Sequence, residues 1–131
     1  MRTILLKLIL IQIYRSIKFV DASWHLNKAR NAIHEHAQQR IPGSVFFDIG
    51  DISDKLSPFP HMLPSESVFE EKVSSLGINS DEHLFVYANA GAFSAARVWW
   101  TFRAFGHNRV SVINGGLPAW LSIGGPTESG I

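Results

Sequence analysis

Four short apolar runs, separated by segments of helical periodicity, constrain the fold of this 131-residue chain most strongly. The runs are FVDA at residues 19–22, VFFD at 45–48, LFVY at 84–87 and VSVI at 110–113. Each is continuous rather than alternating, which is typical of strands that are covered on both faces. Strands that alternate with helices build a mostly parallel sheet with right-handed crossovers. The sequence therefore predicts an α/β domain with helices on both faces of its sheet.

Helix signals lie between these runs. Ser65 and Ser67 are candidate N-caps, Ser67 forms a capping box with Glu70, and Gly77 stands where such a helix would end. The predicted helices cover residues 65–77, 93–106 and, with weaker signals, 27–39 and 117–122.

The second predicted helix carries a pair of tryptophans. Its apolar repeat places Trp99 in the core, whereas Trp100 lies about 100° further round the helix and is expected to face a partner domain. Arg103 and His107 follow Trp100 on the same predicted face. Arg97, in the first turns of this helix, is expected to pair with a nearby carboxylate.

Composition excludes several classes of function. Twelve basic and eleven acidic residues leave a net charge of +1, and no basic run suits nucleic acid or an anionic membrane surface. The chain has no cysteine, which removes disulfides, cysteine zinc sites and any thiol mechanism within it. His34 and His36 are two residues apart and do not share a helix face, so no metal site is predicted there. No cofactor is expected.

The two ends of the chain differ from its middle. Residues 1–20 are apolar with scattered basic residues, but their longest uninterrupted apolar run, at 8–11, is far shorter than the roughly 20 residues of a membrane span. We expect a first helix packed on the domain, with a membrane-surface helix as the alternative, and a cytoplasmic protein. Residues 124–130 have the composition of a linker, so a further segment is expected to follow.

The stretch VYANAGAFSAARVWW, residues 86–100, predicts a strand, a tight loop and a helix start. Such turns surround the loop with backbone N–H groups and a helix N-terminus, which suits an anion or an activated nucleophile. The strand ends at Ala88, and residues 88–93 contain no cysteine, serine or carboxylate. The loop is therefore predicted to have the form of a reactive site without a nucleophile.

Five motifs in order closely resemble the N-terminal half of two-domain rhodaneses, the 3-mercaptopyruvate and thiosulfate sulfurtransferases. They are DASW at 21–24, IPGSVFFD at 41–48, SPFPHMLP at 57–64, FSAARVWW at 93–100 and GGLPAW at 115–120. The resemblance implies a rhodanese-like domain at residues 19–123, a divergent segment at 1–18 and the start of an interdomain linker at 124–131. In that family, the second domain carries the cysteine that accepts sulfur from the donor as a persulfide.

The resemblance also assigns site residues. Ala88 falls at the position of the catalytic cysteine in the other copy, and His61 matches the histidine that the first domain lends to a complete two-domain site. The acidic residue that accompanies this histidine falls on Gly50, unless the neighbouring Asp51 substitutes for it. Asn114 and Arg40 also depart from the family pattern; substrate-binding residues remain unknown.

Three functions follow as hypotheses. The first is a sulfurtransferase half that is inactive alone and needs a C-terminal catalytic rhodanese domain and a small sulfur donor. The second is an interaction or regulatory module that docks on a separately encoded catalytic domain. A reading frame directly downstream that encodes such a domain would support this second hypothesis. The third, hydrolysis of an anion or phosphate ester in the loop at Ala88, lacks a nucleophile.

Overall fold

The computed structural model describes residues 16–130. The expected first helix at residues 1–20 lies largely outside the described residues, and its described end, residues 17–20, is strand and not helix. Its centre is a four-stranded sheet in the order β2-β1-β3-β4, and every pairing is parallel. The strands are β1 (Ile17–Asp21), β2 (Val45–Phe46), β3 (His83–Tyr87) and β4 (Val110–Val112). The predicted strands and their parallel arrangement are thereby confirmed.

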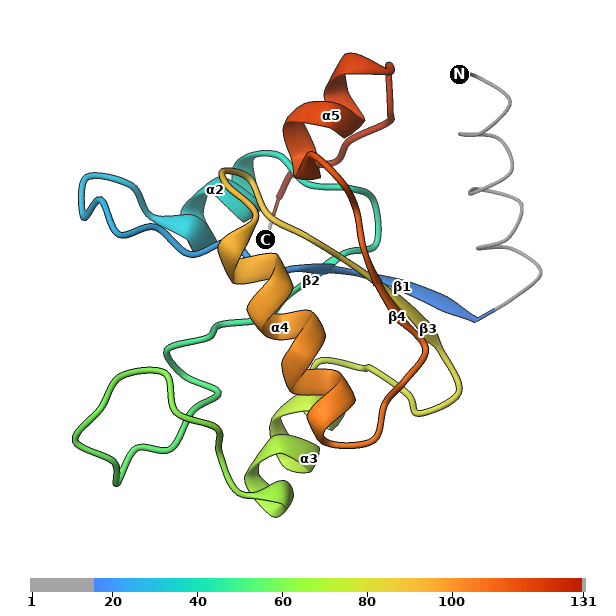
Figure 1. Cartoon of the computed structure of the whole chain (residues 1–131). Helices are drawn as coiled ribbons and strands as arrows, with labels where there is room; N and C mark the ends of the chain where they lie inside the picture. The colour runs from blue at the N-terminus through green and yellow to red at the C-terminus, as the bar shows by residue number, and fades with distance from the viewer. Residues whose placement is uncertain (1–15, 131) are drawn as a thin grey trace.

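Alternate residues of the central strands face two separate cores. Val20, Leu84 and Val86 belong to one cluster with residues of α3 (Glu66–Ser75) and α4 (Phe93–Ala104). Phe19 and Tyr87 belong to the other cluster, which includes residues of α5 (Gly116–Ser122). Figure 1 shows α4 running across the front of the sheet. Both faces are therefore covered, as the continuous apolar runs predict.

The structure shows where two of the predicted helices begin: α3 starts at the predicted N-cap Ser65, whereas α2 (Ala32–Gln38) starts later than predicted. The N-cap of α3 is Ser65, whose Oγ accepts from the amide of Val68 at 3.3 Å, so the capping box of Ser67 and Glu70 is wrong. The helix α2 is capped by Asn31 rather than beginning at residue 27. Asn27 instead accepts from the amide of Ala29 through its own side chain, a turn that competes with helix formation.

The segment after α5 runs back over the end of α2. Arg40 and Glu128 form an isolated antiparallel bridge and an ion pair with Nε and Oε1 3.2 Å apart. The indole of Trp120 donates to the carbonyl of Pro126 at 2.7 Å. Residues 124–130 are thus fixed to the domain.

No helix between residues 16 and 130 is both long and apolar enough to cross a membrane.

Candidate functional site

The β3–α4 loop, residues 88–92, lies at the carboxyl end of the sheet, where open α/β sheets bind ligands. Ala88 is only 1% exposed, and its carbonyl accepts from the amide of Leu117 at 3.0 Å. A Cβ on Gly116, which has φ +58°, would come within 2.2 Å of the same carbonyl oxygen. The start of α5 therefore holds Ala88 by a close backbone contact that only glycine allows.

A buried aspartate at the end of β1 organises the other side of this loop. Asp21 is 2% exposed and accepts from both the amide (2.9 Å) and the hydroxyl (2.5 Å) of Ser23. Its second oxygen lies 2.9 Å from Nδ1 of His36 on α2. The Ser23 hydroxyl in turn accepts from the amide of Asn89 at 2.7 Å. The loop is thus connected to the core carboxylate of β1.

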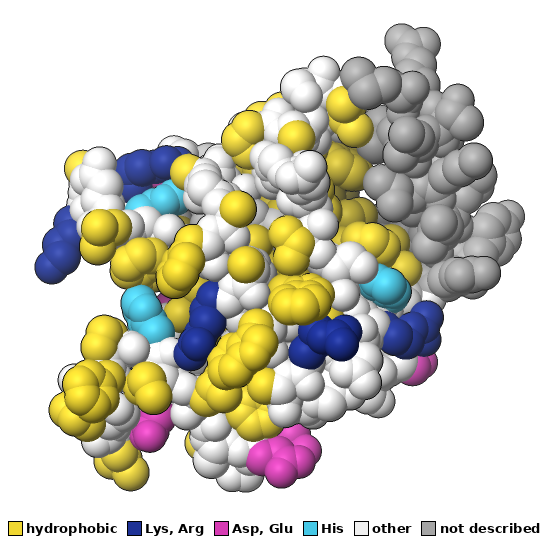
Figure 2. All heavy atoms as spheres, viewed as in Figure 1, with side chains coloured by type: hydrophobic (Ala, Val, Ile, Leu, Met, Phe, Trp, Pro, Cys, Tyr) yellow, Lys and Arg dark blue, Asp and Glu magenta, His cyan; other side chains and the backbone are white. Residues whose placement is uncertain are grey.

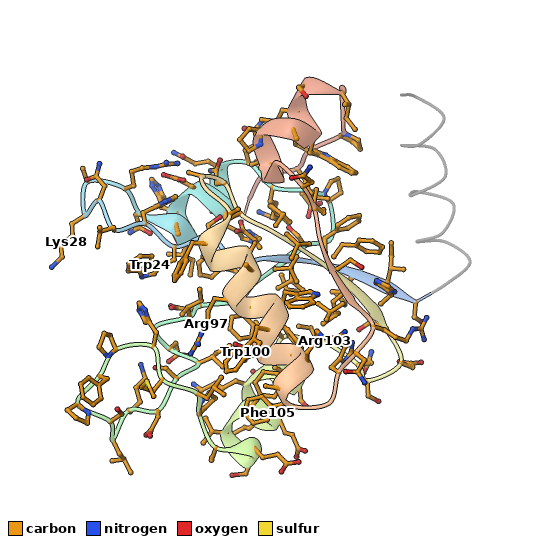
Figure 3. All side chains as sticks on the ribbon, in the orientation of Figure 1. Trp24, Lys28, Arg97, Trp100, Arg103 and Phe105 are labelled. Atoms are coloured by element: carbon orange, nitrogen blue, oxygen red, sulfur yellow. The ribbon has the colours of Figure 1, made fainter. Side chains whose placement is uncertain are left out.

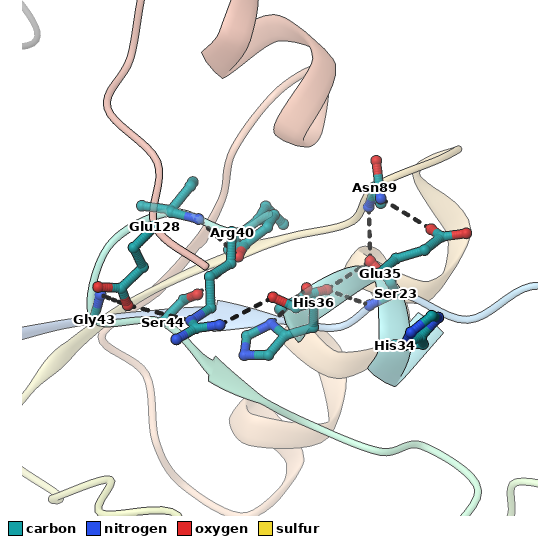
Figure 4. A network of polar contacts seen from close by, with 12 residues as sticks. Ser23, His34, Glu35, His36, Arg40, Gly43, Ser44, Asn89 and Glu128 are labelled. Atoms are coloured by element: carbon teal, nitrogen blue, oxygen red, sulfur yellow. Dashed lines mark hydrogen bonds and ion pairs between the residues drawn. The ribbon is translucent and has the colours of Figure 1, made fainter. Parts of the chain in front are cut away.

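Glu35 on α2 holds the same loop through a side chain (Figure 4). Its Oε1 accepts from the Asn89 amide group at 2.9 Å, lies 3.0 Å from Nε2 of His25, and is 2.7 Å from Nη2 of Arg30. The hydrogen bonds from Arg30 hold the pKa of the Glu35 carboxyl below its usual value. Glu35 is therefore an ionised anchor for a loop that carries no charge of its own.

Sequence reasoning missed both anchors. The sequence singles out Asp21 only as part of the DASW motif, Glu35 only as part of a weak helix, and His36 only as a rejected metal ligand. Asn89 bonds to Glu35, 54 positions away, and to Ser23, 66 positions away. Ser23 in turn bonds to Asp21. A carboxylate directly after a buried strand was the one available signal for Asp21.

His61 lies in the β2–α3 loop, residues 47–65, and is the one non-glycine residue with positive φ (+59°) among residues 16–130. Its ring packs edge-on against Trp24, with centroids 5.1 Å apart. Its carbonyl accepts from Nη2 of Arg97 at 2.5 Å. Left-handed backbone in a residue with a side chain is strained, and such strain clusters at functional sites. Contacts with Trp24 and Arg97, both outside the loop, thus help to hold His61 in this conformation.

The predicted carboxylate partner of Arg97 is wrong. Within the described part of the chain its guanidinium makes no ion pair. It donates to the His61 carbonyl and lies over the ring of Trp100, 5.0 Å from its centroid. Figure 3 shows Arg97 extending from α4 on the side where Trp24 lies.

The predicted basic face beside Trp100 is also corrected. Trp100 is 45% exposed, as expected, but Arg103 lies over Trp99 at 5.2 Å and not beside Trp100. His107 lies with its Nε2 2.9 Å from the carbonyl of Glu82. Trp99 packs against the core and donates through its indole to Val110. The basic group beside Trp100 is therefore Arg97, about one turn before it, and not Arg103, about one turn after it.

A pocket of about 260 Å³ lies between Trp24, the β2–α3 loop and the start of α4. Its lining residues are Trp24, Ile49, Pro60, His61, Met62, Phe93, Ser94 and Arg97. Figure 2 shows a recess between the two projecting parts of this face, bordered by hydrophobic, basic and histidine side chains. A larger hollow of about 490 Å³ lies between α3 and the far end of α4, away from both loops.

The acidic residue that the resemblance places beside His61 is not found in this pocket. Gly50 has no side chain to offer, and a carboxylate oxygen of Asp51 lies 3.1 Å from Nζ of Lys72 on α3. The lining residues of the pocket include no carboxylate. The structure therefore does not bring the possible substitute Asp51 to His61. Among residues 16–130, no cluster of three or more histidine or acidic side chains is arranged to hold a metal ion.

Comparisons with known proteins agree with this geometry. The model of the family described as "Rhodanese-like domain" matches residues 15–123. The chain belongs to the rhodanese-like domain family. The predicted resemblance to the first domains of thiosulfate and 3-mercaptopyruvate sulfurtransferases is confirmed, and so is the predicted rhodanese fold.

Relatives with similar sequences are sulfurtransferases. The chain is 47% identical over 116 residues to thiosulfate/3-mercaptopyruvate sulfurtransferase 2 of Arabidopsis thaliana, covering 88% of this chain and 34% of the relative. It is 48% identical over 115 residues to thiosulfate sulfurtransferase of Bos taurus, covering 86% of this chain and 39% of the relative. This rhodanese-like chain thus spans little more than a third of such relatives.

A solved structure shows the same arrangement. SseA from Escherichia coli, described with the 3-mercaptopyruvate sulfotransferases, aligns with a TM-score of 0.89 and 39% identity over 96% of this chain and 49% of that one. Tum1 from Saccharomyces cerevisiae aligns with a TM-score of 0.81 and 35% identity, over 95% of this chain and 42% of the other. The chain therefore matches between about two fifths and one half of these proteins.

Proposed function

We propose that this chain is the non-catalytic half of a two-domain sulfurtransferase site, to which it supplies His61 and one wall of the substrate cleft. The observation that carries the proposal is the pairing of two loops at one end of the sheet. One is a strand-to-helix loop with a buried alanine at its start, and the other presents a histidine in a strained conformation.

A persulfide needs a thiolate, and this chain has no cysteine. In the proposed site the thiolate therefore belongs to a second rhodanese domain. The chain contributes an imidazole, which can donate or accept a proton near neutral pH. The names of the relatives support thiosulfate or 3-mercaptopyruvate as the sulfur donor. Trp100, half-exposed on α4, is the side chain we assign to the contact with the second domain.

The test measures sulfur transfer by the purified chain alone and after addition of a cysteine-bearing second domain from a 3-mercaptopyruvate sulfurtransferase. We expect no turnover alone with either donor, and turnover above that of the second domain alone in the mixture. Because the domains are not tethered, the gain should appear only at high protein concentration. Turnover by this chain alone that survives repurification would overturn the proposal, and so would a mixture no faster than its second domain.

A further inference from the structure

Arg97 on α4 contacts both residues that the proposed function uses. Its Nη2 donates to the carbonyl of His61 at 2.5 Å, and its guanidinium lies over the ring of Trp100, 5.0 Å from the centroid. Trp100 follows Arg97 by three residues on the same helix, so the two side chains share a face (Figure 3). Arg97 therefore connects the β2–α3 loop to the half-exposed indole on α4.

No other described group competes for this guanidinium. Arg97 makes no ion pair with a described residue, and the His61 carbonyl is the only acceptor of its N–H groups within residues 16–130. A hydrogen bond from a charged donor is stronger than one between neutral groups. The carbonyl of His61 and the ring of Trp100 therefore set the position of the Arg97 side chain.

The carbonyl that Arg97 holds belongs to the strained residue itself. His61 has φ +59°, and a residue with a side chain keeps such a backbone only where its surroundings hold it. Its ring packs edge-on against Trp24, with centroids 5.1 Å apart. A turn of the His61 backbone to negative φ would change the direction of the side chain and end this contact. Arg97 therefore helps to fix the direction in which the imidazole points.

Covering Trp100 would strengthen this arrangement. The indole is 45% exposed, and a cation–π contact gains strength when water is removed from it. A second domain that packs on the indole removes that water, and the guanidinium of Arg97 then leaves the ring less readily. The hydrogen bond to the His61 carbonyl is held by the same side chain. Contact at Trp100 is thereby linked to the orientation of His61.

We propose that Arg97 is a positioning residue that couples docking of the second domain on Trp100 to the orientation of the His61 ring. The proposal rests on the proposed function, in which Trp100 contacts the second domain and His61 takes part in the reaction. Arg97 acts through His61 and touches no reacting atom.

The first test uses the purified chain alone and measures backbone amide order parameters by NMR relaxation. In Arg97→Met we expect the values at His61 and Met62 to fall from about 0.85, typical of a rigid backbone, to about 0.6. Arg97→Lys, which keeps the charge but lacks the planar fork, should give intermediate values. Unchanged order at His61 in Arg97→Met would overturn the proposal.

Arg103→Met is the matched control for this measurement. Arg103 also lies over a tryptophan of α4, Trp99 at 5.2 Å, and also donates to a loop carbonyl, that of Asn108 at 3.4 Å. It makes no hydrogen bond to the β2–α3 loop, so its loss should leave the order at His61 unchanged. An equal fall in Arg103→Met would assign the effect to general loosening of α4 and overturn the proposal.

The second test measures turnover of 3-mercaptopyruvate with a saturating amount of the cysteine-bearing second domain. Arg97→Met should lower kcat about tenfold and change KM less than about twofold, because a misdirected imidazole slows the chemical step. Arg97→Lys should recover part of the loss. In the His61→Ala background, Arg97→Met should have no further effect. A tenfold loss in both backgrounds would show that Arg97 acts directly and would overturn its role as a positioning residue.

The link to docking is tested with Trp100→Leu in the same mixture. At saturation, this variant should lower kcat about threefold, the loss of one partly exposed cation–π contact. The loss should be absent in the Arg97→Met background, because Trp100 acts on His61 through Arg97. A loss of equal size in both backgrounds would overturn the coupling.

Failure of the proposed function gives a different pattern. If His61→Ala alone leaves turnover unchanged, the proposed function fails, whereas the order parameters of the isolated chain still decide whether Arg97 holds His61. If His61→Ala lowers turnover and Arg97→Met does not, the proposed function stands and the positioning role of Arg97 is wrong.

Discussion

The two loops at the carboxyl end of the sheet differ in what holds them and in what they offer. The β3–α4 loop is fixed by Asp21, Glu35 and Gly116 from three other segments, yet it has no reactive side chain. The β2–α3 loop offers His61 and exposes apolar side chains such as Leu56 and Phe59. The comparison shows that a loop can keep the backbone shape of a reactive site without carrying a reactive side chain. Anchors outside the loop hold its shape although the loop, from Ala88 to Ala92, has no reactive side chain.

The largest expected effect comes from removing the core anchor of the β3–α4 loop. Asp21→Ala leaves the Ser23 hydroxyl and His36 without their buried acceptor, and we expect a loss of about 3–5 kcal/mol in the free energy of unfolding. Urea denaturation measures it. His34→Ala, on the same helix as His36 but exposed, should change stability by less than about 0.5 kcal/mol. Similar losses in the two variants would remove Asp21 as the anchor.

The glycine contact at Ala88 gives the next effect. Gly116→Ala must displace the Ala88 carbonyl, so we expect about 2–4 kcal/mol of destabilisation. Gly91→Ala is the control: it also has positive φ, but its added Cβ meets open space. It should cost only about 1–2 kcal/mol, the conformational penalty alone. Equal losses would mean that α5 does not fix Ala88.

The Glu35 anchor should reveal itself through pH. Because the folded-state pKa of Glu35 is lowered from 4.5, its stabilising contribution is present above the unfolded value and is lost as pH falls through the folded one. The free energy of unfolding should decline between about pH 5 and pH 3. In Glu35→Gln this part of the decline should disappear. An unchanged pH profile in the variant would assign the decline to other carboxylates.

The strain at His61 predicts the smallest effect and sharpens the contrast between the loops. Both His61→Ala and His61→Gly lose the ring contact with Trp24, but only glycine adopts positive φ without a steric penalty. His61→Gly should therefore be more stable than His61→Ala by about 1 kcal/mol, measured by thermal unfolding. Equal stabilities would show that the backbone at His61 is not strained.

The sequence predicts the strands and helices and their order because the signals for them, continuous apolar runs and helix-ending glycines, lie within the segments that they define. Gly77 and Gly106, for example, end α3 and α4 with positive φ as predicted. The start of α2 was misplaced because Asn27 forms a local turn that outcompetes a helix with a weak apolar pattern.

The candidate site was less predictable than the fold. Asn89 meets Ser23 and Glu35 only after the chain has folded, and no periodicity encodes those contacts. Arg97 was assigned a carboxylate because helix arginines often have one, whereas here a strained loop supplies a carbonyl instead. His61 came from the motif resemblance alone, since nothing in its local sequence predicts a positive φ.

The most direct measurement of the central claim compares His61→Ala with the parent chain in the mixture with a cysteine-bearing second domain. If His61 moves a proton in the reaction, turnover of 3-mercaptopyruvate should fall by about 100-fold or more, while the affinity between the two domains stays within about twofold. His34→Ala should change neither quantity. If His61→Ala leaves turnover unchanged while the domains still bind, the chain is only a scaffold and the account is wrong.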